Sequence, residues 1–267
     1  MAVTWTVLGS GSGGNCTVLS SSHTQIMVDA GFSCKETLRR MKTAGVDPHR
    51  TRAIFVSHEH SDHVAGAERL ARVLKIPVYL TEGTLQGWRR YLRDKMKTEP
   101  QLDRVETFAA GVRLTIGDIS VMPFTIPHDC ADPVGFTFLA EGMKAALVTD
   151  LGYVARNVAE HLRGCDLLMM ESNHDLEMLR VGPYPWAVKQ RVLGRTGHLS
   201  NTALAEFLST EYDRAARFVI LAHLSETNNH PEIARREAEN ALSRASVLLE
   251  SRLFLASQQQ PLESITM

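Results

Sequence analysis

The chain has few cysteines, no long apolar run and almost no net charge, and each shortage excludes a class of protein. Its 267 residues include four cysteines, which are widely separated and form no CxxC pair. They therefore indicate neither a zinc ribbon nor a disulfide framework. No apolar stretch approaches the roughly 20 residues that a membrane-spanning helix needs. The formal net charge of −1 argues against a strongly basic protein that coats nucleic acid.

Little else in the composition is unusual. The start of the sequence lacks the basic stretch and apolar core of a secretory signal, so we expect a cytoplasmic protein without a membrane anchor. With 44% apolar and 22% charged residues, the chain resembles an ordinary globular protein and is long enough for a layered core. Because no linker, repeat or low-complexity segment interrupts it, we expect a single domain over residues 1–267, with a short C-terminal tail after about residue 256.

The densest group of polar residues is HEHSDH at residues 58–63, directly after the apolar run 53–56. Its first two histidines are two residues apart, so at a strand end they point to the same side. Its final aspartate and histidine begin a helical pattern that continues to Leu74. A strand end followed by a helix can direct two groups at one cation and two at a second. Imidazole and carboxylate ligands suit zinc, manganese or iron, so the stretch predicts a metal site.

The glycines of residues 9–14 fit the dinucleotide-binding pattern GxGxxG, and Asp29 lies where a ribose-binding acid would follow. The run that follows, residues 16–19, is typical of a strand rather than of the helix that this pattern requires, and a second strand is expected over residues 25–29. We therefore interpret the glycines as part of a β-meander. Such a loop is either a tight turn or a site where backbone N–H groups approach a phosphate, and the sequence favours neither.

A predicted helix over residues 84–97 combines basic and aromatic side chains. These are Arg89, Arg90, Arg93, Lys95 and Lys97, with Trp88 and Tyr91 between them. Basic residues beside aromatics can hold a nucleic-acid strand. A charge run is more often a solvated helix face, and the sequence alone favours that interpretation.

Three further strands end on residue types that bind metals: His128, Asp150 and His223. An isolated histidine or aspartate at a strand end is more often structural. Following HxHxDH in this order, however, they resemble the later ligands of the metallo-β-lactamase superfamily. The resemblance implies an α/β fold, the αββα sandwich, in which two mixed β-sheets are flanked by helices.

The resemblance also assigns seven side chains to two divalent metal ions, either zinc or manganese, with iron also compatible. The first ion is assigned to His58, His60 and His128, the second to Asp62, His63 and His223, and Asp150 bridges the two. A shared carboxylate offsets the repulsion between cations about 3.5–4 Å apart. A hydroxide bridging the two metals is then the expected nucleophile. Asp62 is counted as catalytic as well as a ligand.

Further motifs narrow the resemblance to the YycJ/WalJ-like group, whose members are similar to exonucleases that degrade duplex DNA from 5′ ends. They are GSGSGGN at 9–15, DAGFS at 29–33, HD-x2-DPVGF at 128–136, TDLG at 149–152, ESNHD at 171–175, GHLSN at 197–201 and AHLSE-x-NN at 222–229. The implied function is a metal-dependent phosphodiesterase, with DNA as substrate and 5′-to-3′ exonuclease activity as the favoured form. The alternative is a two-metal hydrolase of a small ester, thioester, lactone or cyclic phosphodiester. A catalytically idle partner protein would lack a ligand, and all seven are present.

Residues 197–198 and 222–225 also resemble late motifs of tRNase Z-type phosphodiesterases, in which a histidine that binds no metal acts near the scissile phosphate. His198 is therefore assigned to stabilise developing charge or to protonate the leaving oxygen. The alternative is that His198 caps a helix, which Ser200 or Asn201 would do better.

Two other polar features lie near the motifs. The cluster at residues 171–175 either orients the ligands or contacts the substrate, and the sequence does not decide between these roles. Glu59 is left out of the ligand set because a strand would point its side chain away from its neighbours.

Overall fold

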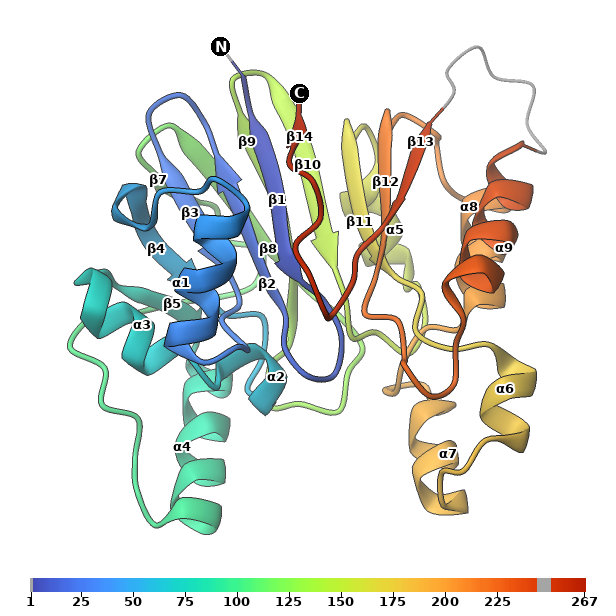
Figure 1. Ribbon diagram of the computed structural model, residues 1–267, viewed down its shortest axis with the longest axis horizontal. Coiled ribbons are helices and arrows are strands. Elements are labelled where there is room, and N and C mark those ends of the chain that lie inside the picture. Colours follow the sequence, from blue (N-terminus) through green and yellow to red (C-terminus); the bar gives the residue numbers. More distant parts are fainter. Residues whose placement is uncertain (1, 244–250) are drawn as a thin grey trace.

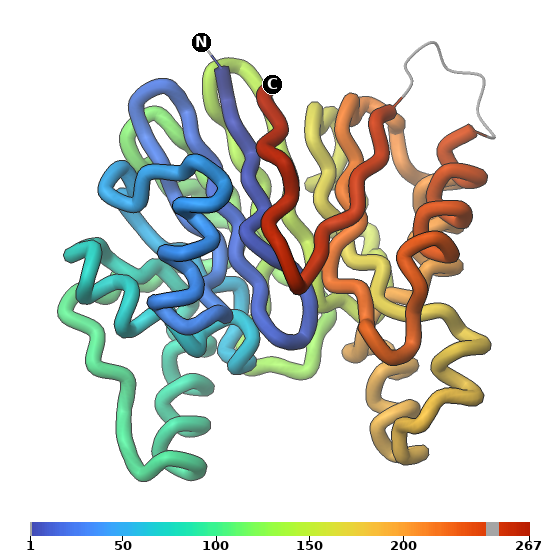
Figure 2. Tube along the Cα trace, viewed as in Figure 1, coloured from blue at the N-terminus to red at the C-terminus, as the bar shows by residue number. Residues whose placement is uncertain are grey.

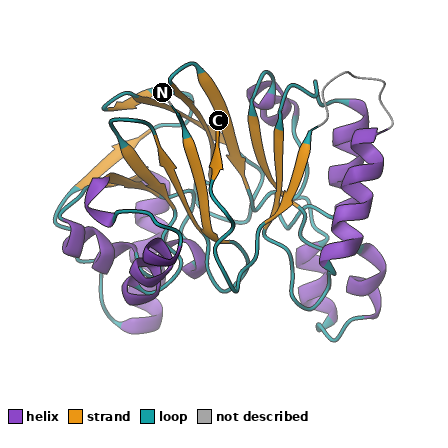
Figure 3. Ribbon diagram, turned by 45° about the horizontal axis from the view of Figure 1, so that its top comes forward, coloured by secondary structure: helices purple, strands orange, loops and turns teal. Residues whose placement is uncertain are grey.

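The computed structural model describes residues 2–243 and 251–267. Over these residues the chain forms two mixed sheets that face each other, with helices on the outer side of each sheet (Figures 1 and 3). The layers therefore run helix, sheet, sheet, helix. This confirms the predicted αββα sandwich.

The first sheet has the strand order β14-β1-β2-β3-β4-β5-β6 within the described residues. Its β1, β2 and β3 form an antiparallel meander, as the glycine-rich segment predicts, whereas β3 to β6 pair in parallel. The strands are β1 (Thr4–Gly9), β2 (Cys16–Ser20), β3 (Gln25–Val28), β4 (Thr51–Phe55), β5 (Val78–Thr81), β6 (Val105–Phe108) and β14 (Ile265–Thr266).

The second sheet has the order β13-β12-β11-β10-β9-β8-β7 over the same described part of the chain. Strands β7 to β10 are antiparallel, and β10 to β13 are parallel. The strands are β7 (Leu114–Ile116), β8 (Ile119–Thr125), β9 (Val134–Ala140), β10 (Met143–Val148), β11 (Leu167–Glu171), β12 (Phe218–Ala222) and β13 (Arg252–Leu255).

Both faces of the sheets are covered, so the strands divide their side chains between two apolar layers. In β10, Ala145 and Leu147 face the core between the sheets, and Ala146 and Val148 face the outer helices. This follows from the period-two alternation of a strand. Aromatic rings join the sheets across the central core, as where β4 and β9 bring two phenylalanine rings to 5.8 Å in an edge-to-face contact.

Helices on the first sheet precede residue 97, and those on the second follow residue 155. The first set is α1 (Cys34–Thr43), the short η1 (Pro48–Arg50), α2 (Ser61–Val64), α3 (Ala67–Leu74) and α4 (Glu82–Met96). The second set is α5 (Arg156–Leu162), α6 (Leu176–Val181), α7 (Trp186–Val192), α8 (Asn201–Thr210) and α9 (Pro231–Ser243). Within the described residues, every helix is too short or too polar to cross a membrane.

The single helix predicted from residue 62 to Leu74 is wrong, because α2 and α3 are separate. At the break, the Gly66 N–H donates to the Ala30 carbonyl at 2.8 Å. A Cβ at Gly66 would lie 1.9 Å from the Phe32 carbonyl oxygen, so this backbone contact requires glycine. The apolar periodicity continues across the break, which is why the pattern alone did not reveal it.

The segment after residue 256 packs along the first sheet. Strand β14 pairs with β1, and Figure 2 shows this red end of the trace beside the blue start. The Gly13 N–H donates to Gln258 Oε1 at 2.6 Å, and the Ser10 N–H donates to the Ser257 carbonyl at 3.1 Å. The C-terminal segment therefore holds the glycine-rich loop in place.

Candidate metal centre

The predicted ligands lie at one edge of the sandwich, where strands of both sheets end. Strand β4 leads into the HEHSDH segment, β8 precedes His128, β10 precedes Asp150 and β12 precedes His223. Because parallel strands end at the same edge, residues far apart in the sequence meet there. The structure brings all seven predicted ligands together.

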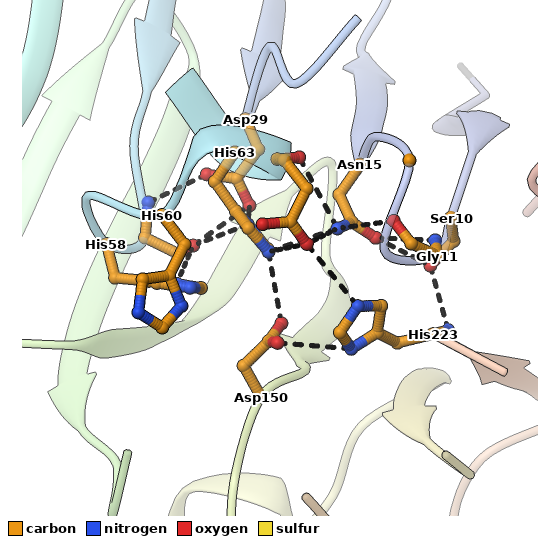
Figure 4. Close-up of polar contacts among 12 residues, drawn as sticks. Ser10, Gly11, Asn15, Asp29, His58, His60, His63, Asp150 and His223 are labelled. Carbon is orange, nitrogen blue, oxygen red and sulfur yellow. Dashed lines mark hydrogen bonds and ion pairs between the residues drawn. The ribbon is translucent and has the colours of Figure 1, made fainter. Parts of the chain in front are cut away.

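Three residues within two positions of a strand end adopt a left-handed backbone: Asp29 (φ 58°) after β3, Asp150 (φ 61°) after β10 and His223 (φ 54°) after β12. L-residues rarely adopt this conformation, although aspartate and histidine do so more often than most. It bends the chain sharply as each strand ends and turns the side chain toward the site (Figure 4). Each such residue costs about 1–3 kcal/mol and persists only where its surroundings fix it.

The first group of ligands contains His58, His60 and His128. His60 Nδ1 lies 3.2 Å from His128 Nε2, close to the roughly 3.3 Å expected of two nitrogens on one tetrahedral zinc. Cys130 joins this group, with its Sγ 3.3 Å from His60 Nε2. One ligand atom from each of these four residues lies within 4.8 Å of the others.

The second group contains Asp62, His63, Asp150 and His223. His63 Nε2 lies 3.2 Å from Asp150 Oδ2 and 3.5 Å from Asp62 Oδ2. His223 Nε2 is also 3.5 Å from Asp62 Oδ2, and Figure 4 shows Asp150 between His63 and His223. Asp150 Oδ1 lies 4.0 Å from His128 Nε2 in the first group, so this carboxylate reaches both.

Several polar atoms in these groups are buried without a hydrogen-bond partner. They are His58 Nε2, Asp150 Oδ2 and His223 Nε2, from three different strand ends. Leaving a buried polar atom unpaired costs about 1–3 kcal/mol. Divalent cations bound by these nitrogen and oxygen atoms would satisfy them. The donor set therefore fits two metal ions.

Carboxylates behind the second group fix the orientation of its imidazoles. His63 Nδ1 lies 2.8 Å from Asp29 Oδ2, and His223 Nδ1 lies 2.9 Å from Glu171 Oε1. Asp29 is itself held by the Ser57 N–H at 2.8 Å. Such a partner holds the proton on Nδ1 and leaves Nε2 free to bind a metal. Asp29, which also fits the ribose position of a dinucleotide fold, thus supports a histidine instead.

The imidazoles of the first group have mainly neutral groups behind them. Asp129 Oδ1 lies 3.8 Å from His60 Nε2 and 3.4 Å from His128 Nε2, but the Asp129 carboxylate is paired with Arg191 at 2.6 Å. The His58 Nδ1 contacts the Ser57 hydroxyl at 3.0 Å, and His128 Nδ1 donates to the Gly197 carbonyl at 3.2 Å. His60 has the Cys130 thiol beside its Nε2. The two groups therefore differ in the charge that surrounds them.

Glu171 is completely buried and links two histidines. Its Oε1 accepts hydrogen bonds from His198 Nδ1 at 2.8 Å and from His223 Nδ1, while its Oε2 accepts from the N–H groups of Leu151 and Leu199. Of the two roles open to the 171–175 cluster, Glu171 therefore has the orienting one. His198 lies between the ligands and the cleft, with 18% of its side chain exposed.

The helix-capping alternative for His198 is wrong. Ser200 is the N-cap of α8, and its hydroxyl accepts from the Ala203 N–H at 3.1 Å. The His198 ring instead lies beside two predicted ligands, with centroids 5.4 Å from His128 and 5.2 Å from His223. His198 is therefore free to act in the cleft.

The pKa values separate the two groups when no metal is bound. Burial lowers the pKa of His63 and His223, but carboxylates, including Asp150, outweigh it and hold both well above the usual value. Burial and neighbouring histidines lower the pKa of His58 and His60. Metal-free, the second group is therefore a set of ion pairs, whereas His58 and His60 favour the neutral ring.

Glu171 and His198 also shift each other's pKa. Burial raises the pKa of Glu171, but hydrogen bonds and charge from His198 and His223 lower it to about 2. Burial lowers the pKa of His198, and the charge of Glu171 reverses this, leaving it above the usual value. The pair therefore favours protonation of the His198 imidazole beside an ionised Glu171 carboxylate.

A cleft of about 740 Å³ opens over the two groups. Its floor includes Asp62, Asp150, His198 and His223, and its walls include residues of α4 and Arg191 of α7. The substrate can therefore reach the ligands and His198 from the same side.

The glycine-rich loop borders this cleft, and the N–H groups of its glycines at 11, 13 and 14 are already paired. The N–H of Gly11 donates to Asn15 Oδ1, that of Gly13 to Gln258 Oε1 and that of Gly14 to the Gly11 carbonyl. Of the two alternatives for the loop, the structure favours the tight turn.

Three supporting residues, Asp29, Ser57 and Cys130, were missing from the predicted site. A fourth, Glu171, was predicted only as part of a cluster with two possible roles. A usable signal existed for three of the four, because Asp29, Ser57 and Glu171 stand at or just after a strand end, as four of the predicted ligands do. Cys130 follows a predicted ligand by two residues, and a lone cysteine gives no comparable signal. Glu59, left out of the ligand set, lies outside both groups and accepts from the Ala131 N–H at 2.9 Å.

Comparison with known proteins agrees with this geometry. Residues 24–224 match the family described as "Beta-lactamase superfamily domain". Exodeoxyribonuclease YycJ of Bacillus anthracis is 37% identical over 242 residues, which are 91% of this chain and 90% of that protein. Exodeoxyribonuclease WalJ of Streptococcus pneumoniae is 34% identical over 243 residues, 91% of this chain and 89% of that protein.

Among solved structures, the metallo-β-lactamase fold protein YhfI from Bacillus subtilis superposes with a TM-score of 0.73. The superposition covers 98% of this chain and 99% of that one at 17% identity, which shows the fold alone. The family match and the two relatives show the family as well as the fold. The chain belongs to the β-lactamase superfamily and, within it, to the family of the YycJ and WalJ proteins.

Proposed function

We propose that the chain is a metal-dependent exodeoxyribonuclease that hydrolyses phosphodiester bonds of duplex DNA in the 5′-to-3′ direction. The observation that carries the proposal is the position of His198, which lines the cleft beside both ligand groups while Glu171 holds its Nδ1. Two relatives, which align with 91% of this chain at 37% and 34% identity, are named exodeoxyribonucleases.

Seven residues would hold two divalent cations, zinc or manganese, with iron also compatible. We assign His58, His60 and His128 to one cation, Asp62, His63 and His223 to the other, and Asp150 to both. When bound, the cations would supply Lewis acidity and a water that is deprotonated near neutral pH.

His198 is proposed to act on the phosphate. Its Nδ1 donates to Glu171, so in the protonated ring the second proton is at Nε2. That proton can stabilise charge on a phosphate oxygen or pass to the leaving oxygen. Asp62 is proposed as a second catalytic residue, because its carboxylate is 17% exposed, lines the cleft and can accept a hydrogen bond from an attacking water.

We also propose that residues 1–267 form one domain and that the protein is cytoplasmic. Strands β1 and β14, from opposite ends of the described chain, pair in the first sheet. This pairing supports one domain. All four cysteines are free thiols, which suits a reducing compartment.

The test is digestion of a DNA duplex labelled at the 5′ or the 3′ end, with manganese and the purified protein. We expect the 5′ label to be released first. Asp150→Asn should lose bound metal and about 1,000-fold or more in activity, because it removes a proposed ligand. The fold should be kept, since asparagine has the same size and tolerates the left-handed backbone. His198→Ala should keep both metals and lose about 100- to 1,000-fold in kcat.

Each arm has an outcome that contradicts the proposal. Earlier release of the 3′ label would reverse the polarity, and full turnover by His198→Ala would remove that residue from the mechanism. If protein holding two metals per chain cleaves no DNA with any divalent cation, the alternative hydrolysis of a small ester, thioester, lactone or cyclic phosphodiester replaces the nuclease.

A further inference from the structure

We propose that α4 is a binding surface for the DNA strand outside the reacting phosphate, with Arg90, Tyr91 and Lys95 as its contacts toward the cleft. The inference rests on the proposed exonuclease function and adds the surface that holds the substrate. It also reverses the interpretation of this charged helix that the sequence alone favours, the solvated face.

Helix α4 is fixed directly to the segments that carry the ligands. Gly87 lies against Glu59 of the HEHSDH segment, where a Cβ would come within 2.4 Å of Glu59 Oε1. The same Glu59 oxygen accepts from the Ala131 N–H. Near the start of α4, the Thr84 hydroxyl donates to the Asp132 carbonyl at 3.2 Å. A strand lying on α4 is therefore held at a set distance from the metal centre.

The exposed part of α4 forms one wall of the cleft. Arg90, Tyr91 and Lys95 line the same 740 Å³ space as Asp62 and His198. Figure 1 shows α4 projecting beyond the sandwich on one side and α7 on the other. A substrate bound in the cleft at His198 therefore lies beside α4.

The basic surface continues around the helix. A second hollow of about 300 Å³ is lined by Gln86, Arg89, Arg90 and Arg93. Arg90 borders both this hollow and the cleft, so it connects the basic outer face of α4 with the cleft, whose lining on α4 also includes Asp94. A bound strand could follow this face outward.

One basic residue of α4, Arg93, pairs with Glu99 at 3.5 Å, but three others have no such partner in the part of the chain that the structure describes. Within the described residues, Arg89, Arg90 and Lys95 are exposed and form no ion pair with a carboxylate, although Asp94 lies one turn after Arg90. On α1 and α3, by contrast, Arg39 and Arg72 each pair with a glutamate one turn earlier, at 2.7 and 2.9 Å. Solvated helix faces commonly carry such pairs. Their absence leaves these cations of α4 available to a polyanion.

The spacing fits a nucleic-acid strand better than a single phosphate. Arg90 and Lys95 are five residues apart, or about 7.5 Å along a helix, and a DNA strand carries a phosphate about every 3.4 Å along the helix axis. Between them, Tyr91 has 42% of its surface exposed and can stack on a base. A basic surface with an aromatic platform is how proteins hold a strand without reading its sequence.

The experiment measures DNA binding without cleavage. All variants carry Asp150→Asn, and fluorescence anisotropy follows a fluorescein-labelled 30-base-pair duplex across a range of salt concentrations. The test variant adds R89A, R90A and K95A. The matched control adds K35A, K42A and R113A, which remove the same charge from exposed residues outside the cleft.

We expect the α4 variant to bind about 10- to 100-fold more weakly at low salt, with a slope of log K against log salt that is smaller by about 2–3. The control variant should bind within about twofold of its parent, and both should unfold at the parent's temperature. Equal binding by the two triple variants would overturn the inference while leaving the exonuclease standing if the intact protein digests DNA. Failure of the parent to bind DNA and of the intact protein to digest it would overturn both.

Discussion

The two ligand groups share one short motif, yet they lie in different electrostatic surroundings. His63 and His223 have carboxylates behind them, Asp29 and Glu171, and their own group adds Asp62 and Asp150. The first group is three imidazoles backed by a hydroxyl, a thiol and a carbonyl.

This difference indicates that the spacing of ligands in a motif does not by itself set their affinity for a metal ion. Negative charge close to a buried site attracts a divalent cation far more than neutral donors do. The first group is also more open, since the His60 side chain is 31% exposed and that of His63 is fully buried. We therefore expect the second group to bind its cation first and release it last.

The largest effects should come from two single substitutions, each of which removes one imidazole from one group. His58→Ala should reduce bound zinc from two ions to one, which stays in the carboxylate-rich group. His63→Ala should lower the affinity of that tighter group by more than 100-fold, because it also leaves Asp29 buried without its partner. Metal content after dialysis against a weak chelator checks both, and loss of both ions from His58→Ala alone would reverse the order.

A smaller effect should follow from changing the groups behind the ligands. Asp29→Asn removes the charge behind His63 and should weaken metal binding about 10- to 100-fold. Asparagine also tolerates the left-handed backbone at this position, so the fold is kept. Cys130→Ser, behind His60, should change affinity less than about threefold. Competition with a colour-forming chelator measures both, and equal losses would mean that the charge of the backing group is immaterial.

The smallest effect concerns the stability of the metal-free protein against pH. The raised pKa values of His63 and His223 stabilise the fold below their unfolded value near 6.5, and this contribution is lost as pH rises through the folded values. The lowered pKa values of His58 and His60 act oppositely, so stability falls as pH drops below about 6.5.

Thermal unfolding with a chelator between pH 5 and 9 should therefore show a maximum near pH 6–7, falling by about 2–4 °C on each side. His63→Gln should flatten the alkaline side only, and His58→Gln the acidic side only. An alkaline side unchanged by His63→Gln would show that its ion pair with Asp29 does not stabilise the fold.

The sequence predicted the fold and the convergence of the ligands because the family resemblance agrees with the positions of His58, His128, Asp150 and His223 after strands. Strand ends are visible as apolar runs that stop at a polar residue, as before His58, Asp150 and His223. In parallel strands, such ends share an edge. The structure brings the seven residues together in the two groups assigned from the resemblance; their binding of metal stays a prediction.

What the sequence did not reveal depends on contacts between distant segments. The break between α2 and α3 is imposed by the backbone at Phe32, which the apolar pattern does not record. The orienting role of Glu171 requires that His198 and His223, 25 residues apart, meet on one carboxylate. The pairing of residues after 256 with β1 requires a partner at the other end of the chain.

The left-handed backbone at Asp29, Asp150 and His223 sets local backbone stability against activity. Glycine at any of the three would relieve about 1–2 kcal/mol of local strain and so favour the folded chain. The same change would delete a proposed ligand or its support. Selection for folding alone therefore acts on the backbone strain and the ion pairs at these positions, whereas activity requires the side chains themselves.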